Sequence, residues 1–239
     1  MILLKDLFTL LATGEFSNIA LQRDRTGNIN EAEYEKILGH INLGLVEIYK
    51  RFRFLEEELT LHADPSVTTY YLQPARLAAL ANISTNLYIE QPPDHDGQIN
   101  IIEIKAVFDE NEVPLRLNNR LTIPAIRQIA PDVLKITGLT AAQKLTVLFQ
   151  AHPSKIILDD DLDPETYAVP ISETIVEALL YYVASRVYKP MGANNSTVNA
   201  DKSISYQQQY ELACQKLQLF GLDIEAEDGS DTFTANGWV

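Results

Sequence analysis

Apolar residues recur at helical spacing near both ends of the chain. In the N-terminal part they predict a helix over residues 3–13 and a longer one over residues 30–52. Asn30 is a suitable N-cap residue for the second helix, because its side chain can accept a hydrogen bond from a free backbone N–H. Gly39 and Gly44 lie inside this helix, where each costs about 1 kcal/mol relative to alanine, and they leave room for a neighbour to approach closely.

A third helix is predicted over residues 171–188. The chain is apolar on nearly every side of this helix between Ile175 and Ala184, a pattern typical of a helix buried on several sides. Pro190 and Gly192 are predicted to end it. Another part of the protein must therefore cover this helix.

A fourth helix follows a polar loop and is amphipathic. Its opposite face is rich in glutamine, which predicts contact with water. The apolar face contains Tyr206, Tyr210, Ala213, Cys214, Leu217 and Phe220. Cys214 is the only cysteine, so no disulfide can form within the chain, and we expect the thiol to act as a small core residue.

The middle of the chain has the composition of a β-rich region. Runs of β-branched, aromatic and aliphatic residues predict strands at 54–62, 67–72, 99–108, 113–117 and 144–150. We expect the first two to pair across the turn at Asp64-Pro65-Ser66, and the next two to form a hairpin across residues 109–112. In the strand 99–108, the even-numbered residues are predicted to face the core.

These elements predict an α+β fold that is mainly helical. Residues 1–52 and 165–222 form a helical bundle, residues 53–164 form a β-rich insert, and residues 223–239 form an acidic extended C-terminal tail. No stretch reaches the roughly 18 consecutive apolar residues of a membrane span, and no cleavage signal follows the apolar start. We therefore expect neither secretion nor membrane insertion.

The net charge of −14 limits which partners the protein can bind. A protein that held DNA by its phosphates would need basic patches, so ordinary DNA binding is disfavoured. Acidic residues concentrate in 159–165 and 223–231. Such runs form either a solvated surface or a surface that DNA passes without sticking, because like charges repel over about 8–10 Å at physiological salt.

A search for catalytic or metal-binding motifs finds none. The four histidines are scattered, and no phosphate-binding loop, nucleophile elbow or zinc motif occurs. Asp159, Asp161 and Asp163 resemble the start of a calcium loop, but Pro164 and Pro170 stand where glycine and glutamate belong. We expect no catalytic residue, no cofactor and no metal, and hence no enzyme, although a catalytic carboxylate pair cannot be recognised among 33 acidic residues.

Several aromatic residues are candidates for contacts with other molecules. Tyr70-Tyr71 and Tyr181-Tyr182 are equally compatible with an interface and with core rings that have a wet hydroxyl. Two sets of residues are predicted to make contacts: Tyr181, Tyr182, Tyr206, Tyr210 and Leu217 in subunit packing, and Phe233, Trp238 and Val239 in binding of a partner.

The chain resembles the head-to-tail adaptor, or connector, proteins of short-tailed bacteriophages. The resemblance rests on the helical start, the IIEIKAVFDENEVPLRL hairpin, and the ETIVEALLYYVASRVYKP helix followed by YQQQYELACQKLQLF. It implies a structural virion protein, made in the host cytoplasm and located in the neck or tail. It also implies a homo-oligomer, a twelve-subunit ring, that docks beneath the portal protein and offers a platform to a tail tube, nozzle or other tail component.

In such a ring, DNA would pass through the channel without specific binding, and a neighbouring subunit would help to cover the apolar helix 171–188. Three alternatives remain open at this point. The chain could be another neck or tail protein such as a tail terminator, a hydrolase that uses carboxylates without a recognisable motif, or an interaction domain outside any virus.

Overall fold

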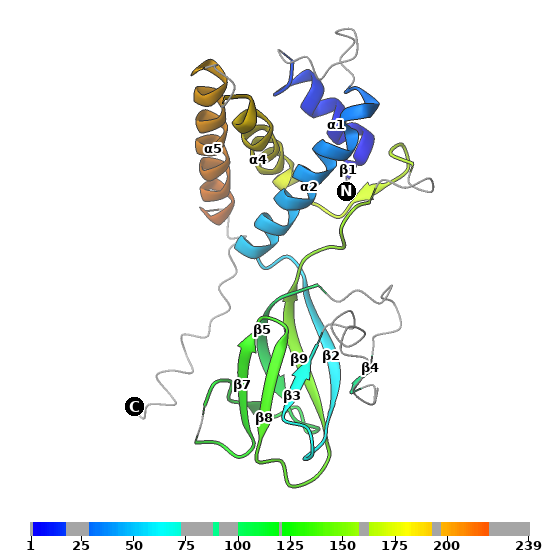
Figure 1. The fold of residues 1–239 in the computed structure, drawn as a ribbon, viewed down its shortest axis with the longest axis vertical. Helices are drawn as coiled ribbons and strands as arrows, with labels where there is room; N and C mark the ends of the chain where they lie inside the picture. The colour runs from blue at the N-terminus through cyan, green and yellow to red at the C-terminus, as the bar shows by residue number, and fades with distance from the viewer. Residues whose placement is uncertain are drawn as a thin grey trace. The chain divides into compact units, whose positions relative to one another are not determined.

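The computed structural model describes residues 2–17, 29–72, 88–90, 100–119, 121–157, 163–192 and 197–219. The chain divides into two compact units. One comprises Met1–Phe52 and Lys155–Val239, and the other comprises Arg53–Ser154. All four described helices belong to the first unit, and eight of the ten described strands belong to the second (Figure 1).

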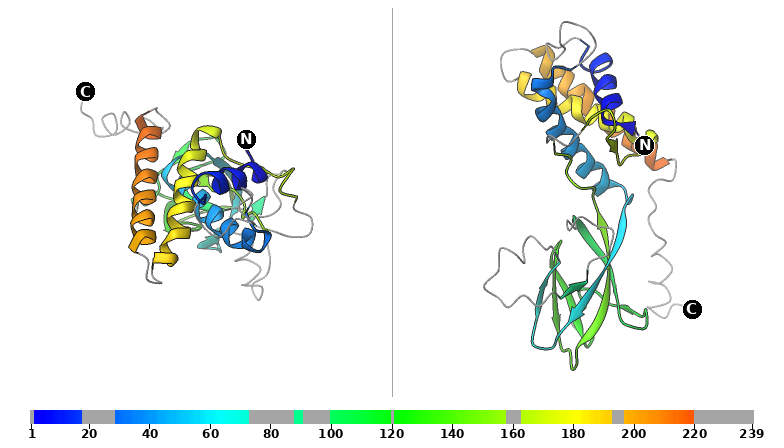
Figure 2. Two further views of the ribbon diagram at one scale, coloured as in Figure 1. Left: turned by 90° about the horizontal axis from the view of Figure 1, so that it is seen from above. Right: turned by 90° about the vertical axis from the view of Figure 1, so that its right-hand side faces the viewer.

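The helical unit consists of α1 (Leu4–Thr13), α2 (Glu31–Arg51), α4 (Glu173–Gly192) and α5 (Thr197–Leu217). Two short strands, β1 (Ile2–Leu3) and β10 (Ala168–Val169), pair antiparallel beside the start of α1. Seen from above, α4 lies between α5 and the N-terminal helices (Figure 2). The helical unit is therefore arranged around α4.

Burial of α4 on several sides is confirmed. It packs against α1, α2 and α5 of the same chain, and most of its length from Ile175 onward is buried. The buried residues are Ile175, Val176, Ala178, Leu179, Val183, Ala184, Ser185, Val187 and Tyr188. Helices of the same chain therefore supply most of the cover of α4, and additional cover by a neighbouring subunit stays a prediction.

Local sequence signals predicted the start of α2 correctly but not the end of α4. The Asn30 side chain accepts a hydrogen bond from the backbone N–H of Ala32 at 3.3 Å, so the predicted N-cap of α2 is confirmed. By contrast, α4 continues to Gly192 rather than ending before Pro190. A proline near the end of a helix removes one N–H donor, and packing along α4 outweighs this loss.

The β unit is a sandwich of two antiparallel sheets. One sheet has the order β4-β2-β9-β5-β6 and the other has the order β3-β8-β7. Their bounds are β2 Glu56–Ala63, β3 Thr69–Tyr71, β4 Ile89–Glu90, β5 Ile101–Phe108, β6 Pro114–Leu115, β7 Ala125–Ala130, β8 Val133–Thr137 and β9 Gln143–Ala151. Residues of both sheets form one buried cluster between them.

Strand β2 does not pair with β3, so the hairpin predicted for residues 54–72 was wrong. β2 pairs with β9 and β4, whereas β3 pairs with β8 in the other sheet. The Tyr70 hydroxyl lies 2.8 Å from the Asp64 nitrogen and 3.0 Å from the Val67 oxygen, and it holds the connection between the sheets. The turn at residues 64–66 therefore carries the chain across the sandwich.

Strand β5 pairs with β6 across residues 109–112, as predicted, but the predicted core face of β5 was wrong. The buried residues are Ile101, Ile104 and Val107. The pairing with β9 shifts register twice along β5, between Ile101 and Glu103 and again between Ile104 and Ala106. Each irregularity turns the following residues to the opposite face, which a strict alternation cannot anticipate.

The fold class predicted from the sequence was also wrong in one respect, because the protein is not mainly helical. The segment taken as an insert in a helical bundle is a complete sandwich with its own core, and its described residues form strands and loops only. Short strands with mixed patterns carry a weaker signal than long amphipathic helices, so the sequence understated the β structure. The chain is α+β with one helical unit and one β unit.

Gly39 and Gly44 of α2 allow a matched test of how closely α2 packs against α4. A Cβ atom at Gly44 would lie 2.5 Å from Leu179 Cδ1 and 2.9 Å from Tyr182 Cδ1, whereas one at Gly39 would meet nothing within 4 Å. We expect Gly39→Ala to raise the free energy of unfolding by about 1 kcal/mol. Gly44→Ala should lower it by about 1–3 kcal/mol, because the Leu179 and Tyr182 side chains must shift to make room for the new Cβ atom.

Urea denaturation followed by circular dichroism at 222 nm checks both variants, since the described helices lie in the helical unit. Equal stabilisation by the two substitutions would show that α2 and α4 are not in close contact at Gly44.

Candidate interaction surface

Aromatic rings fill the contact between α4 and α5. The Tyr188 and Tyr206 rings stack with centroids 5.5 Å apart, and Tyr182 meets Tyr210 edge to face at 5.4 Å. Tyr181 lies 6.3 Å from the Tyr206 ring. Aromatic pairs of this kind stabilise a contact by about 0.5–1.5 kcal/mol beyond the area that they bury. These rings therefore join the two helices of a single subunit.

The segment after α1 closes the end of this contact. The Tyr188 hydroxyl donates a hydrogen bond to the backbone oxygen of Glu15 at 2.9 Å, and the Phe16 ring packs on Tyr188 with centroids 6.5 Å apart. Burial, together with Tyr206 and Glu15 nearby, raises the pKa of Tyr188 to about 12. This tyrosine therefore stays protonated and serves as a structural donor.

An ion pair fastens α2 to α5. Arg51 Nη1 lies 2.6 Å from Glu211 Oε2, and the Arg51 side chain is 27% exposed. Next to it, burial raises the pKa of Cys214 and of Tyr210 above their usual values. Cys214 is fully buried, so the prediction that it is a core residue is confirmed.

The outward side of α5 is partly apolar, although the protein as a whole is acidic. Three large aliphatic residues on it, Ile204, Leu212 and Leu219, are each more than half exposed. Gln208 and Gln215, both exposed, lie on the same side of the helix. Between residues 204 and 219 these residues form an uncharged, partly apolar strip with Glu211 and Lys216 at its edges, which is typical of a surface that contacts another protein.

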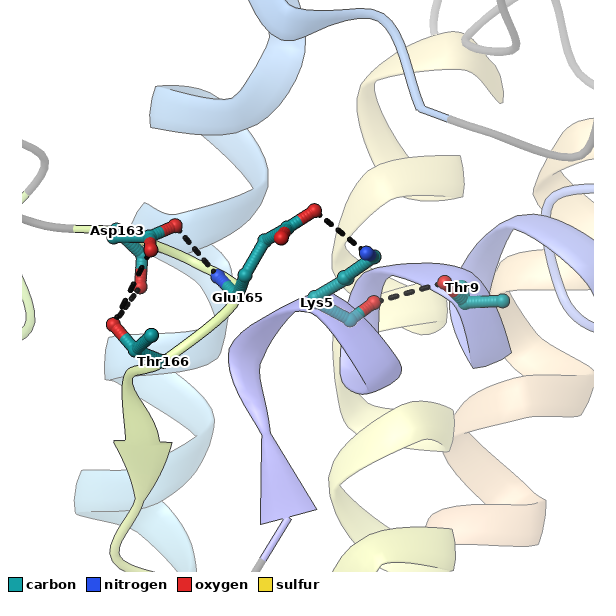
Figure 3. Close-up of polar contacts among 5 residues, drawn as sticks. All are labelled: Lys5, Thr9, Asp163, Glu165 and Thr166. Atoms are coloured by element: carbon teal, nitrogen blue, oxygen red, sulfur yellow. Dashed lines mark hydrogen bonds and ion pairs between the residues drawn. The ribbon is translucent and has the colours of Figure 1, made fainter.

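Part of the acidic run 159–165 has a structural role. Lys5 Nζ lies 2.6 Å from Glu165 Oε1, and Asp163 Oδ1 accepts a hydrogen bond from the Glu165 nitrogen at 2.9 Å (Figure 3). Glu165 raises the pKa of Lys5 by accepting a hydrogen bond from it and by its charge. Because Lys5 and Glu165 are both exposed, this pair adds little stability, but the turn positions the start of α1.

The described residues hold no cluster of three or more metal-ligating side chains. A shallow hollow of about 370 Å³ in the β unit is lined in part by His62, Asp64, Glu110 and Lys144. Its carboxylates serve the local fold: Asp64 accepts from the Ser66 nitrogen at 2.8 Å, and Glu110 accepts from the Lys144 nitrogen at 2.9 Å. This hollow has the features of a turn region rather than of a reaction centre.

The structure brings together all five residues predicted for subunit packing. Tyr181, Tyr182 and Tyr206 are half-buried, and Tyr210 and Leu217 are buried, all within the contact of α4 with its neighbours. Phe233, Trp238 and Val239, predicted to bind a partner, lie outside the described residues, as do Asp159 and Asp161. A contact between subunits through these tyrosines stays a prediction.

Sequence reasoning missed the outward apolar residues of α5. The glutamines of that face predicted contact with water, but Ile204, Leu212 and Leu219 lie among them and are exposed. Their spacing of eight and seven residues follows one side of a helix and was a usable signal. Tyr188 and Glu15 were also missed, because no local pattern shows that their segments meet.

Comparison with known proteins identifies one family. A family model described as SU10 adaptor protein matches residues 15–233. No curated protein matches the chain. Within the part of the chain that the structure describes, no helix is long and apolar enough to cross a membrane.

Glu15 provides a pH test of this region. Burial, with a further contribution from Glu177, raises its pKa, and within the described residues its Oε2 atom is buried without a hydrogen-bond partner. Stability from this group is complete below the pKa of the unfolded chain and is lost as the pH rises through the raised pKa. Glu15→Gln should therefore stabilise the protein at pH 7 and lose this advantage toward pH 4.

Thermal unfolding of both proteins between pH 4 and pH 8 checks this expectation, with Glu35→Gln at an exposed position of α2 as the control. A pH-independent effect of Glu15→Gln would contradict the burial of a charged carboxylate.

Proposed function

Because the chain belongs to the SU10 adaptor protein family of phages, we propose that its copies form a closed ring between the portal and the tail of a virion. On this proposal, the ring has twelve subunits, docks beneath the portal, and offers its far side to a tail tube, nozzle or other tail component. The family match supports an adaptor in the neck, and it favours a structural protein over an enzyme or a tail terminator.

The observation that carries ring formation is the outward face of α5. Cyclic assemblies use two different surfaces of each subunit, and the ring closes when the rotation between neighbours divides a full turn. An uncharged face with Ile204, Leu212 and Leu219 in a chain of net charge −14 is suited to one of these two surfaces. The complementary surface on the neighbour need not be apolar throughout, since such interfaces have polar rims.

The acidic charge supports the part of the proposal that concerns DNA. A strongly negative surface repels the phosphate backbone over about one Debye length, roughly 8–10 Å at physiological salt. DNA that passes a ring of such subunits would move without adhering. The tail 223–239 has five acidic residues and no basic one, and it contributes to this charge.

We expect charged substitutions on the outward face of α5 to prevent assembly on the portal. Ile204→Glu combined with Leu212→Glu places two like charges in the proposed interface, which should reduce association at least tenfold. Val113→Glu, an exposed aliphatic position in the β unit, is the matched control. Co-sedimentation with isolated portal rings measures the effect, with circular dichroism to confirm that the subunits remain folded.

Portal association that survived the double substitution would exclude this face of α5 from the ring interface. Co-sedimentation with tail tubes and not with portals would favour the tail terminator.

The tail supplies a second test. Phe233, Trp238 and Val239 are apolar residues in an otherwise polar segment, so we expect them to anchor the subunit on the portal. Deletion of residues 223–239 should weaken portal binding, and replacing Phe233 and Trp238 by alanine should reproduce most of the loss. Unchanged co-sedimentation of the deletion variant would refute a role of the tail in docking.

A further inference from the structure

One part of the β unit has the opposite charge to the rest of the chain. Between residues 113 and 154 there are five basic residues and a single acidic one, Asp132, although the whole chain has 19 basic against 33 acidic residues. Asp132 is buried and so adds little to the surface charge. The segment from β6 to β9 is therefore a basic region in an acidic protein.

Two of these basic residues lie side by side on the outward face of the three-stranded sheet. Arg127 of β7 and Lys135 of β8 are direct partners in the antiparallel register, and both are exposed. Like charges in such positions repel each other, because their Cβ atoms lie only about 4.5–5.5 Å apart. Neither of them forms an ion pair with another described residue. An anionic partner on this face would relieve the repulsion.

Exposed aliphatic side chains occur in the same segment of the chain as the basic pair. Leu121 is 93% exposed and Ile123 is 84% exposed, and both precede β7. This segment is tied down at its base, where the Asn118 nitrogen donates to the Ile126 oxygen at 2.8 Å. Ile129, exposed at the irregularity of β7, adds a third aliphatic side chain. Large aliphatic groups held this far into water are typical of a protein-binding surface.

From this combination we infer that Leu121, Ile123, Arg127, Ile129 and Lys135, here called the basic apolar face, bind the C-terminal segment 223–239 of a second copy of the chain. That segment has the complementary chemistry, with five acidic residues, no basic residue, and the apolar side chains of Phe233 and Trp238. The 20 residues after Leu219 span up to about 70 Å when extended, which is enough to reach a neighbouring molecule. The inference goes beyond the proposed ring, and it requires no portal.

The apolar and charged contributions act together in such a site. The aliphatic side chains favour binding of the aromatic residues, since burial of a large apolar side chain removes apolar surface from water. The basic pair orients the acidic stretch, and its contribution falls as salt rises. DNA would use only the charges, because its backbone offers no apolar surface to Leu121 and Ile123.

Trp238 is the only tryptophan, so its fluorescence reports on the tail alone. In the full-length protein without portal, we expect a blue-shifted emission and slow quenching by acrylamide, both of which revert on dilution as a second copy is lost. Two double variants should expose Trp238 and weaken binding of a labelled peptide of residues 220–239 at least tenfold. They are Leu121→Ser with Ile123→Ser, and Arg127→Glu with Lys135→Glu.

Two controls match these variants. Val113→Ser changes an exposed aliphatic residue elsewhere in the β unit, and Arg53→Glu with Lys144→Glu makes the same change of charge away from the face. Both should leave Trp238 protected. A peptide with Glu225→Lys and Glu227→Lys should recover affinity for the Arg127→Glu, Lys135→Glu variant, because the charges are exchanged on both sides.

Several outcomes would overturn the inference. Trp238 as exposed in the intact protein as in the free peptide, or protection that persists unchanged on dilution, would contradict binding by a second copy. Binding of a DNA duplex through Arg127 and Lys135, with Trp238 left exposed, would assign the face to nucleic acid. Trp238 exposed in the protein without portal, followed by normal assembly on added portal rings, would reject this inference and leave the proposed function intact.

Discussion

The helical unit depends on the burial of α4. This helix is apolar on nearly every side, and it is stable in water only because α1, α2 and α5 cover it. Its contacts set the other constraints of the unit: Gly44 lets α2 approach Leu179, aromatic rings fill the contact with α5, and the Tyr188 hydroxyl holds the segment after α1. Because α4 is covered within one chain, a subunit can fold before it assembles.

The two units divide the work of an adaptor along physical lines. The helical unit has a continuous core and presents α5 with an uncharged outward side, which suits a repeated contact between identical subunits. The β unit has its own core between two sheets, and its connections can vary without disturbing the helices. If the proposed ring forms through α5, surfaces of the β unit that meet different partners can change while the contact between subunits is kept.

The surface of the β unit also differs locally in charge from the protein as a whole. A net charge of −14 disfavours binding to the DNA backbone, yet Arg127 and Lys135 lie side by side on one face of a sheet. Such an arrangement costs stability where Arg127 faces Lys135, and proteins retain a cost of this kind where a partner offsets it. The charge pattern is thus informative about the contacts of an adaptor protein.

The sequence by itself determined the helices and their buried faces, since the 3.6-residue period of α2 and α5 reports directly on which side meets the core. It also determined the hairpin of β5 and β6 and the burial of Cys214. Only the tertiary structure decided which strands pair, because a sandwich joins residues that lie far apart in the chain, and register shifts in β5 override simple alternation. Likewise, only the fold shows that Glu15 reaches Tyr188 and that Arg127 faces Lys135, since long-range contacts leave no periodic signal in a single sequence.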